Sequence, residues 1–224
     1  MTYSVSASLD RYVASINEEK LPDGKNHPSS LHACERQAYY ARTGTPQTRP
    51  PNEQSLRVFR LGHIVHDLVQ TAMEQDPDVV EFIREVEVEN PALNLKGHAD
   101  GVLTLRNGVK EVIEIKSIGE YGFTKKDLPQ EDHVDQVTDY MVALRIPRAR
   151  IVYVSKEKMA VKEFTVFLSD SRAGRTAARV ERVERAAGLG VPPPCDFAAP
   201  NAKGKRDWHT DYCNWGPKCW ERSE

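Results

Sequence analysis

Polar and apolar residues alternate along three successive stretches in the middle of the chain, and this pattern predicts three β-strands. The stretches are REVEVE at 84–89, LKGHADGVLTLR at 95–106 and VKEVIEIKS at 109–117. The dipeptide Asn107-Gly108, which lies between the second and third stretches, favours a tight turn. The second and third strands should therefore form a hairpin.

Apolar residues recur at helical spacing before these strands. A helix is predicted over 54–75, with an apolar stripe formed by Val58, Leu61, Val65, Leu68 and Ala72. A second helix is predicted over 28–44, where Ser29 or Ser30 would be the N-cap and Gly44 would lie near the C-terminus.

The chain after the hairpin alternates between helical and strand patterns. A helix is predicted over 133–144, strands over 149–155 and 161–168, and a helix rich in Arg, Ala and Glu over 169–187. The segment GLGVPPP at 188–194 should end that helix, because proline cannot continue it. This order of elements indicates an α/β or α+β fold around a mixed central sheet.

Composition narrows the class of protein. The chain has 224 residues, of which 39% are hydrophobic and 29% charged, and its formal net charge is -2. That length suits one sizeable domain with an appendage. The near-neutral net charge means that the protein as a whole has no positive field that would attract nucleic acid. The N-terminus lacks a secretory pattern, and no stretch approaches the roughly 18 consecutive apolar residues of a membrane span. We therefore expect a cytosolic protein without membrane contact.

Four cysteines need an explanation that suits a reducing compartment. Cys34 lies near the start of the chain, whereas Cys195, Cys213 and Cys219 lie in its last thirty residues. Because disulfides are rare in the cytosol, metal ligation or plain buried thiols are the two alternatives.

The register of the predicted hairpin decides whether Asp100 and Glu114 lie side by side. A two-residue type I′ turn would place Asp100 opposite Ile115, so that the two acids would point to opposite faces. A three-residue loop ending in a left-handed Gly108 would instead place Asp100 opposite Glu114 and His98 opposite Lys116.

Two opposed carboxylates repel each other unless a cation lies between them, since their Cβ atoms are about 4.5 to 5.5 Å apart. Oxygen ligands at this spacing favour Mg²⁺ or Mn²⁺. Lys116, two residues after Glu114, could then orient or deprotonate a metal-bound water or neutralise charge on a phosphate. The alternative is a solvent-facing strand edge whose acids and lysine only provide solubility.

Two helices carry polar residues that could complete such a site. Gly62 lies one turn before His66, and a glycine inside a helix costs about 1 kcal/mol relative to alanine, which indicates the close approach of another element. His63 is an equal candidate by composition. Packed or surface histidines are the alternative for both positions.

The predicted helix over 133–144 places His133, Gln136 and Tyr140 on one face. Gln and Tyr side chains can donate hydrogen bonds to phosphate and sugar oxygens without selecting a base sequence. The alternative is a tyrosine half-buried against the sheet beside a solvated glutamine.

Taken together, these segments resemble the PD-(D/E)XK nuclease superfamily in its RecB-like branch. The matching elements, in chain order, are LGHIVH ending at His66, GHAD ending at Asp100, EIK from Glu114 to Lys116, and QVTDY from Gln136 to Tyr140. Ala99 stands where this family often has proline, a departure that the RecB-like branch tolerates.

The resemblance implies a restriction-endonuclease-like sheet flanked by helices, and it implies roles for particular residues. His66, Asp100, Glu114 and the Ile115 carbonyl would bind Mg²⁺ or Mn²⁺, Lys116 would act on the attacking water, and Gln136 and Tyr140 would hold DNA. One of the three acids Glu85, Glu87 and Glu89 would be a further acid near the site.

The cysteines resemble those of the four-cysteine nucleases in this branch, which include CRISPR-associated exonucleases. This implies that Cys34, Cys195, Cys213 and Cys219 hold a [4Fe-4S] cluster, with Zn²⁺ as the alternative. Seventeen residues separate Cys195 from Cys213, where a short step is common. The implied organisation is an N-terminal helical segment at 1–50, a nuclease core at 51–190 and a cysteine-rich segment at 191–224.

Local basic and aromatic residues could hold DNA despite the near-neutral total charge. They are TKKD at 124–127, Arg36, and KGKRDW at 203–208 with Trp208, Trp215 and Trp220. Aromatic side chains can stack on bases, although tryptophans between cysteines more often pack around a metal group and basic runs are more often solvated.

The expected function is a metal-dependent exonuclease for single-stranded or frayed DNA ends. We expect it in the cytoplasm of a bacterial or bacteriophage-infected cell, in DNA repair, recombination or CRISPR processing, as a homo-oligomer or with protein partners. The alternatives are an endonuclease or junction-cutting enzyme with the same centre, and a non-catalytic nucleic-acid-binding protein stabilised by a Cys-bound metal.

Overall fold

The computed structural model describes residues 3–17, 21–125, 127–197 and 208–220. The chain forms two compact units. The first contains Met1–Gly24, Cys34–Leu61 and Arg182–Glu224, and the second contains Lys25–Ala33 and Gly62–Glu181. The three-part division at residues 50 and 190 stays a prediction.

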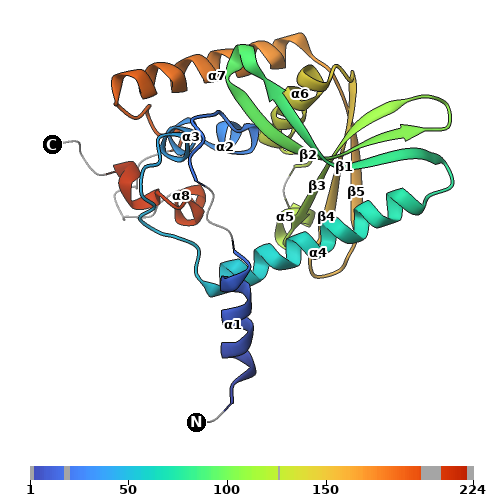
Figure 1. Ribbon diagram of the computed structural model, residues 1–224, viewed down its shortest axis with the longest axis horizontal. Coiled ribbons are helices and arrows are strands. Elements are labelled where there is room, and N and C mark those ends of the chain that lie inside the picture. Colours follow the sequence, from blue (N-terminus) through green and yellow to red (C-terminus); the bar gives the residue numbers. More distant parts are fainter. Residues whose placement is uncertain (1–2, 18–20, 126, 198–207, 221–224) are drawn as a thin grey trace. The chain divides into compact units, whose positions relative to one another are not determined.

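The second unit contains a five-stranded sheet whose spatial order follows the chain (Figure 1). Its strands are β1 (Val79–Asn90), β2 (Leu95–Leu105), β3 (Lys110–Ile118), β4 (Arg148–Ser155) and β5 (Val161–Phe167). Strands β3 and β4 run parallel, and every other neighbouring pair runs antiparallel. All five predicted strands are confirmed, as is the mixed α/β fold.

The described residues of the two units also contain helices. They are α1 (Val5–Ser15), α2 (Pro28–Ala33), α3 (Glu35–Arg42), α4 (Glu53–Gln75), α5 (Glu120–Lys125), α6 (Glu131–Leu144), α7 (Asp170–Leu189) and α8 (Trp208–Tyr212), with 3₁₀ turns at Pro91–Leu93 and Gly216–Trp220. The periodicity predicted α4, α6 and α7, whereas α1, α5 and α8 were not predicted. No helix in the described ranges is long and apolar enough to cross a membrane.

Helices α4 and α6 lie on opposite faces of the sheet (Figure 1). Val65 of α4 packs in one core with Ile113 and Ile115 of β3 and with apolar residues of β4. Val137 and Met141 of α6 pack in the other core, against the reverse face of the same strands. The sheet is therefore buried on both faces, which explains the nearly continuous apolar sequence of β4.

The helix predicted over 28–44 is broken at Cys34, so that prediction was wrong. Cys34 has extended backbone angles, with φ -168° and ψ 128°, and its carbonyl accepts the Ala38 N–H of α3 at 2.9 Å. Helix α2 begins at Pro28, whose missing N–H costs nothing in a first turn. Neither serine is the N-cap. Gly44 follows α3 with a positive φ of 66°, near the predicted end.

The apolar stripe predicted on α4 is wrong in part, because the buried face is rotated. Val65 is 2% exposed, but Leu61 and Leu68 are 41% and 56% exposed. The face toward the sheet instead contains Gly62, Val65 and Gln70. A Cβ atom at Gly62 would lie 3.2 Å from Ser117 Oγ of β3, so this glycine lets the helix approach the sheet closely.

The hairpin of β2 and β3 has the register of the three-residue loop. Gly101 pairs with Ile113 and Val102 with Val112, and Gly108 has a φ of +81°. The ladder ends at Gly101, so the strands separate immediately before Asp100. A Cβ at Gly101 would meet the Phe82 ring at 2.4 Å, and only glycine fits there without a shift.

The first unit is held by polar contacts between its N-terminal and C-terminal parts. The Arg182 guanidinium donates to both carboxylate oxygens of Glu35, with one bond of 2.5 Å. The Trp215 indole N–H donates to the Thr45 carbonyl at 2.8 Å, and the ring lies 6.0 Å from that of Tyr40. These contacts fasten the cysteine-rich end to the segment around α3.

Gly101→Ala should lower the free energy of unfolding by about 1 to 3 kcal/mol, because the added methyl group overpacks the space filled by Phe82. Urea titration measures this change. Gly174→Ala, in the open interior of α7, is the matched control and should stabilise the protein by up to about 1 kcal/mol. Equal stability of Gly101→Ala and the wild type would contradict the packing argument.

Candidate functional site

Asp100 lies where β2 separates from β3. In a paired strand a backbone carbonyl of β2 would accept the Ile115 N–H, but here the Asp100 carboxylate accepts it. Its Oδ2 accepts the Ile115 N–H at 2.5 Å. Its Oδ1 lies 3.3 Å from His66 Nδ1 of α4. The Asp100 side chain is therefore fixed between the end of the ladder and the helix that covers it.

Glu114 and Lys116 of β3 form an ion pair beside Asp100, in which Glu114 is buried and Lys116 is partly buried. Lys116 Nζ lies 2.7 Å from Glu114 Oε1. The same oxygen accepts a hydrogen bond of 3.0 Å from Gln136 Nε2. Glu114 Oε2 is buried and has no hydrogen-bond partner among the described residues. One carboxylate oxygen is thus fully used, and the other is left for a ligand.

Gln136 and Tyr140 of α6 complete this network. Lys116 Nζ donates to Gln136 Oε1 at 2.9 Å, and Gln136 Nε2 also donates to the Tyr140 hydroxyl at 3.0 Å. The two side chains are 5% and 2% exposed. The structure therefore gives them contacts within the site, and their binding to DNA stays a prediction.

The three candidate histidines lie in different surroundings. His66 faces Asp100, whereas His63 is exposed. Burial alone would lower the pKa of His66, but the carboxylates of Asp100 and Glu114 raise it above its ordinary value. His133 Nδ1 lies 2.7 Å from the Tyr153 hydroxyl of β4 and helps to anchor the start of α6.

The two acids and His66 make a site that favours positive charge. Burial raises the pKa of Glu114 to about 7, the Lys116 ammonium opposes that shift, and the Asp100 charge adds to it. A cation near both carboxylates would offset their repulsion and the cost of burying Glu114.

The donor set fits a hard divalent cation. Two carboxylates and one imidazole interact electrostatically, and the Oε2 atom of Glu114 is buried without a hydrogen-bond partner among the described residues. In the described parts of the chain, no group of three or more His, Cys, Asp or Glu side chains is already arranged around one point as metal ligands. The side chains of His66, Asp100 and Glu114 would have to move for the three residues to share an ion.

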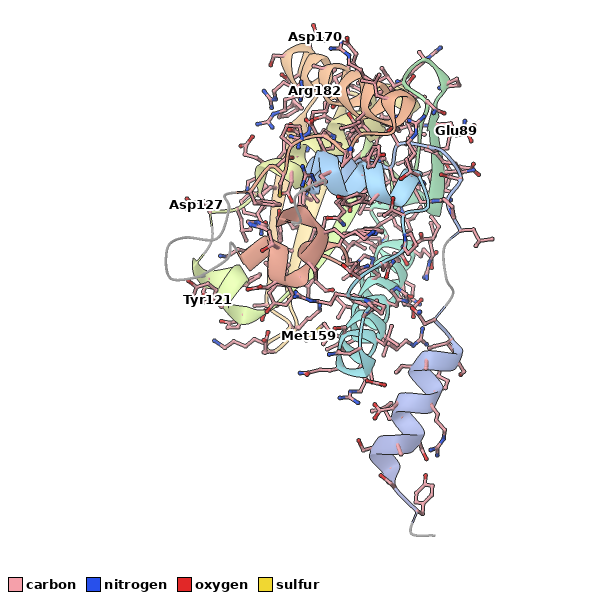
Figure 2. All side chains as sticks on the ribbon, turned by 90° about the vertical axis from the view of Figure 1, so that its left-hand side faces the viewer. Glu89, Tyr121, Asp127, Met159, Asp170 and Arg182 are labelled. Atoms are coloured by element: carbon pink, nitrogen blue, oxygen red, sulfur yellow. The ribbon has the colours of Figure 1, made fainter. Side chains whose placement is uncertain are left out.

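The acids of β1 fall into two groups. Glu85 Oε1 accepts a hydrogen bond of 3.0 Å from Gln70, whose amide also donates to the Asp100 carbonyl. Lys96 Nζ lies 2.7 Å from Glu87 Oε1 and 3.5 Å from Glu89 Oε1. Glu89 is near the tip of the β1–β2 hairpin (Figure 2). Glu85 is therefore the member linked to Asp100.

Sequence reasoning missed Gln70. A signal for it was present, because Gly62, His66 and Gln70 follow one another at intervals of four residues on α4. The amide of Gln70 is 4% exposed and was hidden among the apolar residues of the helix.

The four cysteines lie close enough to one another to interact electrostatically. Burial raises the pKa of Cys219, and Cys195, Cys213 and Cys34 raise it further. Cys195 also shares a hydrogen bond with Cys219, so it lies with the other thiols despite the long insert before Cys213.

Backbone N–H groups point at two of the sulfurs. Burial raises the pKa of Cys34 and Cys213, whereas the N–H groups of Asp196 and Gln37 at the first, and of Trp215 at the second, lower it. Such donors favour thiolates, the form that binds metals and clusters.

Two of the basic and aromatic candidates for DNA binding, Arg36 and Trp215, have structural contacts. The Arg36 guanidinium donates to the carbonyls of Pro193 and Cys219 at 2.6 and 2.7 Å, and Trp215 is buried. Residue 126 and residues 198–207, with most of KGKRDW, lie outside the described residues, as do the side chains of Lys125, Trp208 and Trp220.

Gln136→Leu should destabilise the protein by about 1 to 3 kcal/mol, because it deprives buried Glu114 and partly buried Lys116 of hydrogen bonds. Thermal and urea unfolding measure the loss. Gln130→Leu, just before α6, is the control, since its side chain takes no part in this network. A loss of the same size in both variants would contradict the assigned role.

Comparisons with known proteins show which proteins the chain resembles in sequence and fold. No family model matches the chain. A CRISPR-associated exonuclease Cas4 from Saccharolobus solfataricus is 28% identical over 120 residues, which are 52% of this chain and 57% of that protein. The match thus spans little more than half the length of this relative.

Three solved structures share the fold. The crystal structure of SSO0001 is 16% identical, covers 98% of both chains and has a TM-score of 0.61. An alkaline exonuclease from Laribacter hongkongensis is 14% identical over 75% of this chain and 89% of its own, with a TM-score of 0.54. A phage-related exonuclease from Haemophilus somnus is 13% identical over 74% and 94%, with a TM-score of 0.52.

These likenesses concern the fold and agree with the order of strands and helices in the chain. The chain has a restriction-endonuclease-like fold, and about half of it is similar in sequence to a CRISPR-associated exonuclease.

Proposed function

We propose that this protein is a divalent-metal-dependent DNA exonuclease that hydrolyses phosphodiester bonds at single-stranded or frayed ends. The observation that carries the proposal is the meeting of Asp100, Glu114 and Lys116 where β2 and β3 separate. A buried carboxylate oxygen without a partner, at Glu114 Oε2, supports a cation as part of the site.

Each residue has a role that its contacts allow. His66, Asp100, Glu114 and the Ile115 carbonyl would hold Mg²⁺ or Mn²⁺. That ion supplies Lewis-acid chemistry, which activates water and offsets charge on the phosphate. The Lys116 ammonium, held by Gln136 Oε1 at 2.9 Å, would orient the attacking water or neutralise the developing charge. Gln136 thereby prevents Lys116 from being tied to Glu114 alone.

The relatives support DNA ends as the substrate. The matched Cas4 protein and two of the similar structures are named exonucleases, and the Laribacter enzyme has also been solved in complex with dAMP. A nucleoside monophosphate is the class of product that an exonuclease releases. We extend this activity to the present chain, and with it a role in DNA repair, recombination or CRISPR processing in the cytoplasm.

We also propose that Cys34, Cys195, Cys213 and Cys219 hold a [4Fe-4S] cluster with a structural role, with Zn²⁺ as the alternative. The mutual electrostatic interactions of the thiols and the N–H groups directed at Cys34 and Cys213 support it. Because Cys34 lies about 160 residues before Cys195, such a cross-link would close a long loop of chain and restrict the unfolded state.

Lys116→Ala should lower Mn²⁺-dependent cleavage of end-labelled single strands by at least about 100-fold, because it removes the positive charge beside the reacting phosphate. Lys110→Ala, at the exposed start of the same strand, is the matched control and should retain activity. Circular dichroism shows whether both variants are folded. Cleavage that survives in Lys116→Ala would contradict the assigned site.

The same assay separates the alternative functions. An exonuclease should degrade linear single strands and leave circular ones intact, whereas an endonuclease or junction-cutting enzyme with this centre would cut circles. DNA binding without any Mn²⁺-dependent product, unchanged in Asp100→Ala, would indicate a non-catalytic binding protein.

Cys34→Ala should abolish the iron and sulfide content of anaerobically purified protein and lower its thermal unfolding temperature, because one of four cluster ligands is lost. Iron, sulfide and zinc analyses measure the bound group. Lys116→Ala is the control and should retain iron. Zinc without iron in the wild type would support the alternative, and iron retained by Cys34→Ala would exclude Cys34 as a ligand.

A further inference from the structure

Strands β1 and β2 share a kink at the position of Asp100. Arg84 pairs with Gly101, and Val86 pairs with Ala99, but the pair between them, Glu85 and Asp100, is missing from the ladder. Glu85 has a φ of +48°, in the left-handed region that side chains other than glycine and asparagine rarely adopt. Both strands therefore depart from regular geometry at the residue pair that includes the central acid.

The kink changes which face of the sheet each part of the hairpin presents. Val88 and Ala99, on one side of it, pack in the core under α6, whereas Phe82 and Leu103, on the other side, pack in the core under α4. A regular strand would keep residues separated by an even number on one face. Asp100 thus lies at the crossing between the two faces, where its carboxylate reaches both His66 of α4 and Ile115 of β3.

Gln70 binds both strands at this kink. Its Nε2 donates to the Asp100 carbonyl at 2.8 Å and to Glu85 Oε1 at 3.0 Å. Its side chain is buried against the sheet on the same face of α4 as Gly62 and His66. Helix α4 therefore places three features beside Asp100: Gly62, which allows the close approach, the His66 imidazole and the Gln70 amide.

Another contact between α4 and β1 exists but lies at the surface. Arg84 is bonded to Glu74, Asp67 and Thr71 of α4. Exposed ion pairs contribute little to holding a backbone conformation. Among these contacts, only the Gln70 amide reaches the peptide group of Asp100 itself.

We propose that Gln70 is a positioning residue that holds the kink and so aims the Asp100 carboxylate at the cation site. This inference rests on the proposed function, because it assumes that Asp100 binds a divalent ion. It predicts that Gln70 sets the metal affinity without touching metal, substrate or water. Outer partners of metal ligands commonly change affinity by about 10- to 100-fold when they are replaced.

The test measures binding of Mn²⁺ alone, by electron paramagnetic resonance of free Mn²⁺, with no DNA present. Gln70→Met keeps the size of the side chain and removes both donors, and it should weaken Mn²⁺ binding by about 10- to 100-fold. Gln75→Met, at the exposed end of α4, is the matched control and should bind as the wild type does. Thermal unfolding shows how much of each variant is folded at the temperature of the titration.

If Gln70→Met is unstable, the same substitution is also tested in a protein that carries Glu85→Gly. Glu85→Gly places glycine where φ is positive. Because glycine adopts positive φ readily, the backbone at the kink should need less support from Gln70. In that background Gln70→Met should weaken Mn²⁺ binding less than it does in the parent protein, because the two changes act on one feature. An equal or greater loss in the Glu85→Gly background would overturn the proposal.

The outcomes also separate this inference from the proposed function. Wild-type protein that binds Mn²⁺, together with Gln70→Met that binds it equally well, would overturn the role of Gln70 alone. Wild-type protein that binds no Mn²⁺ would overturn the metal-dependent function and the role of Gln70 with it.

Discussion

The separation of β2 from β3 at Asp100 is the feature on which the site depends. Up to Gly101 the two strands are joined by backbone hydrogen bonds, and beyond it a side-chain carboxylate accepts the Ile115 N–H. This hydrogen bond places the Asp100 carboxylate of β2 near Glu114 of β3, although the two strands are no longer paired there.

Opposite charges and hydrogen bonds offset the cost of placing a buried acid, Glu114, beside a partly buried one, Asp100. Lys116 and Gln136 satisfy one oxygen of Glu114, and His66 lies at one oxygen of Asp100. What is left is a buried oxygen of Glu114 that nothing in the described chain satisfies. Buried polar atoms are rarely left in this state without a functional reason. The cysteine residues belong to the first compact unit and the acidic site to the second, so each centre has its own supporting contacts.

The sequence predicted the elements well and the long-range details less well. Alternation and helical spacing located all five strands and the helices α4, α6 and α7, since each of these patterns is local. The register of the β2–β3 hairpin was open between two turn types, and the left-handed Gly108 settles it. The break at Cys34 was missed because the apolar pattern runs through it. The rotation of α4 was missed because the contact between Gly62 and Ser117 joins segments that are far apart in the sequence.

The same limit applies to the site. Asp100, Glu114 and Lys116 could be selected because one of the two possible registers places them on one face and because they match the family resemblance, but the burial of Gln136 and Tyr140 depends on how α6 packs. The spacing of Gly62, His66 and Gln70 was a sequence signal for Gln70, but its bonds to Asp100 and Glu85 and the kink at Glu85 depend on how α4 packs on the sheet. The central claim is that Asp100 and Glu114 share a divalent ion, and a crystal soaked in Mn²⁺ tests it through anomalous scattering. The account predicts a manganese peak bonded to both carboxylates next to His66, and Mn²⁺ bound elsewhere, with the two acids turned apart, would contradict it.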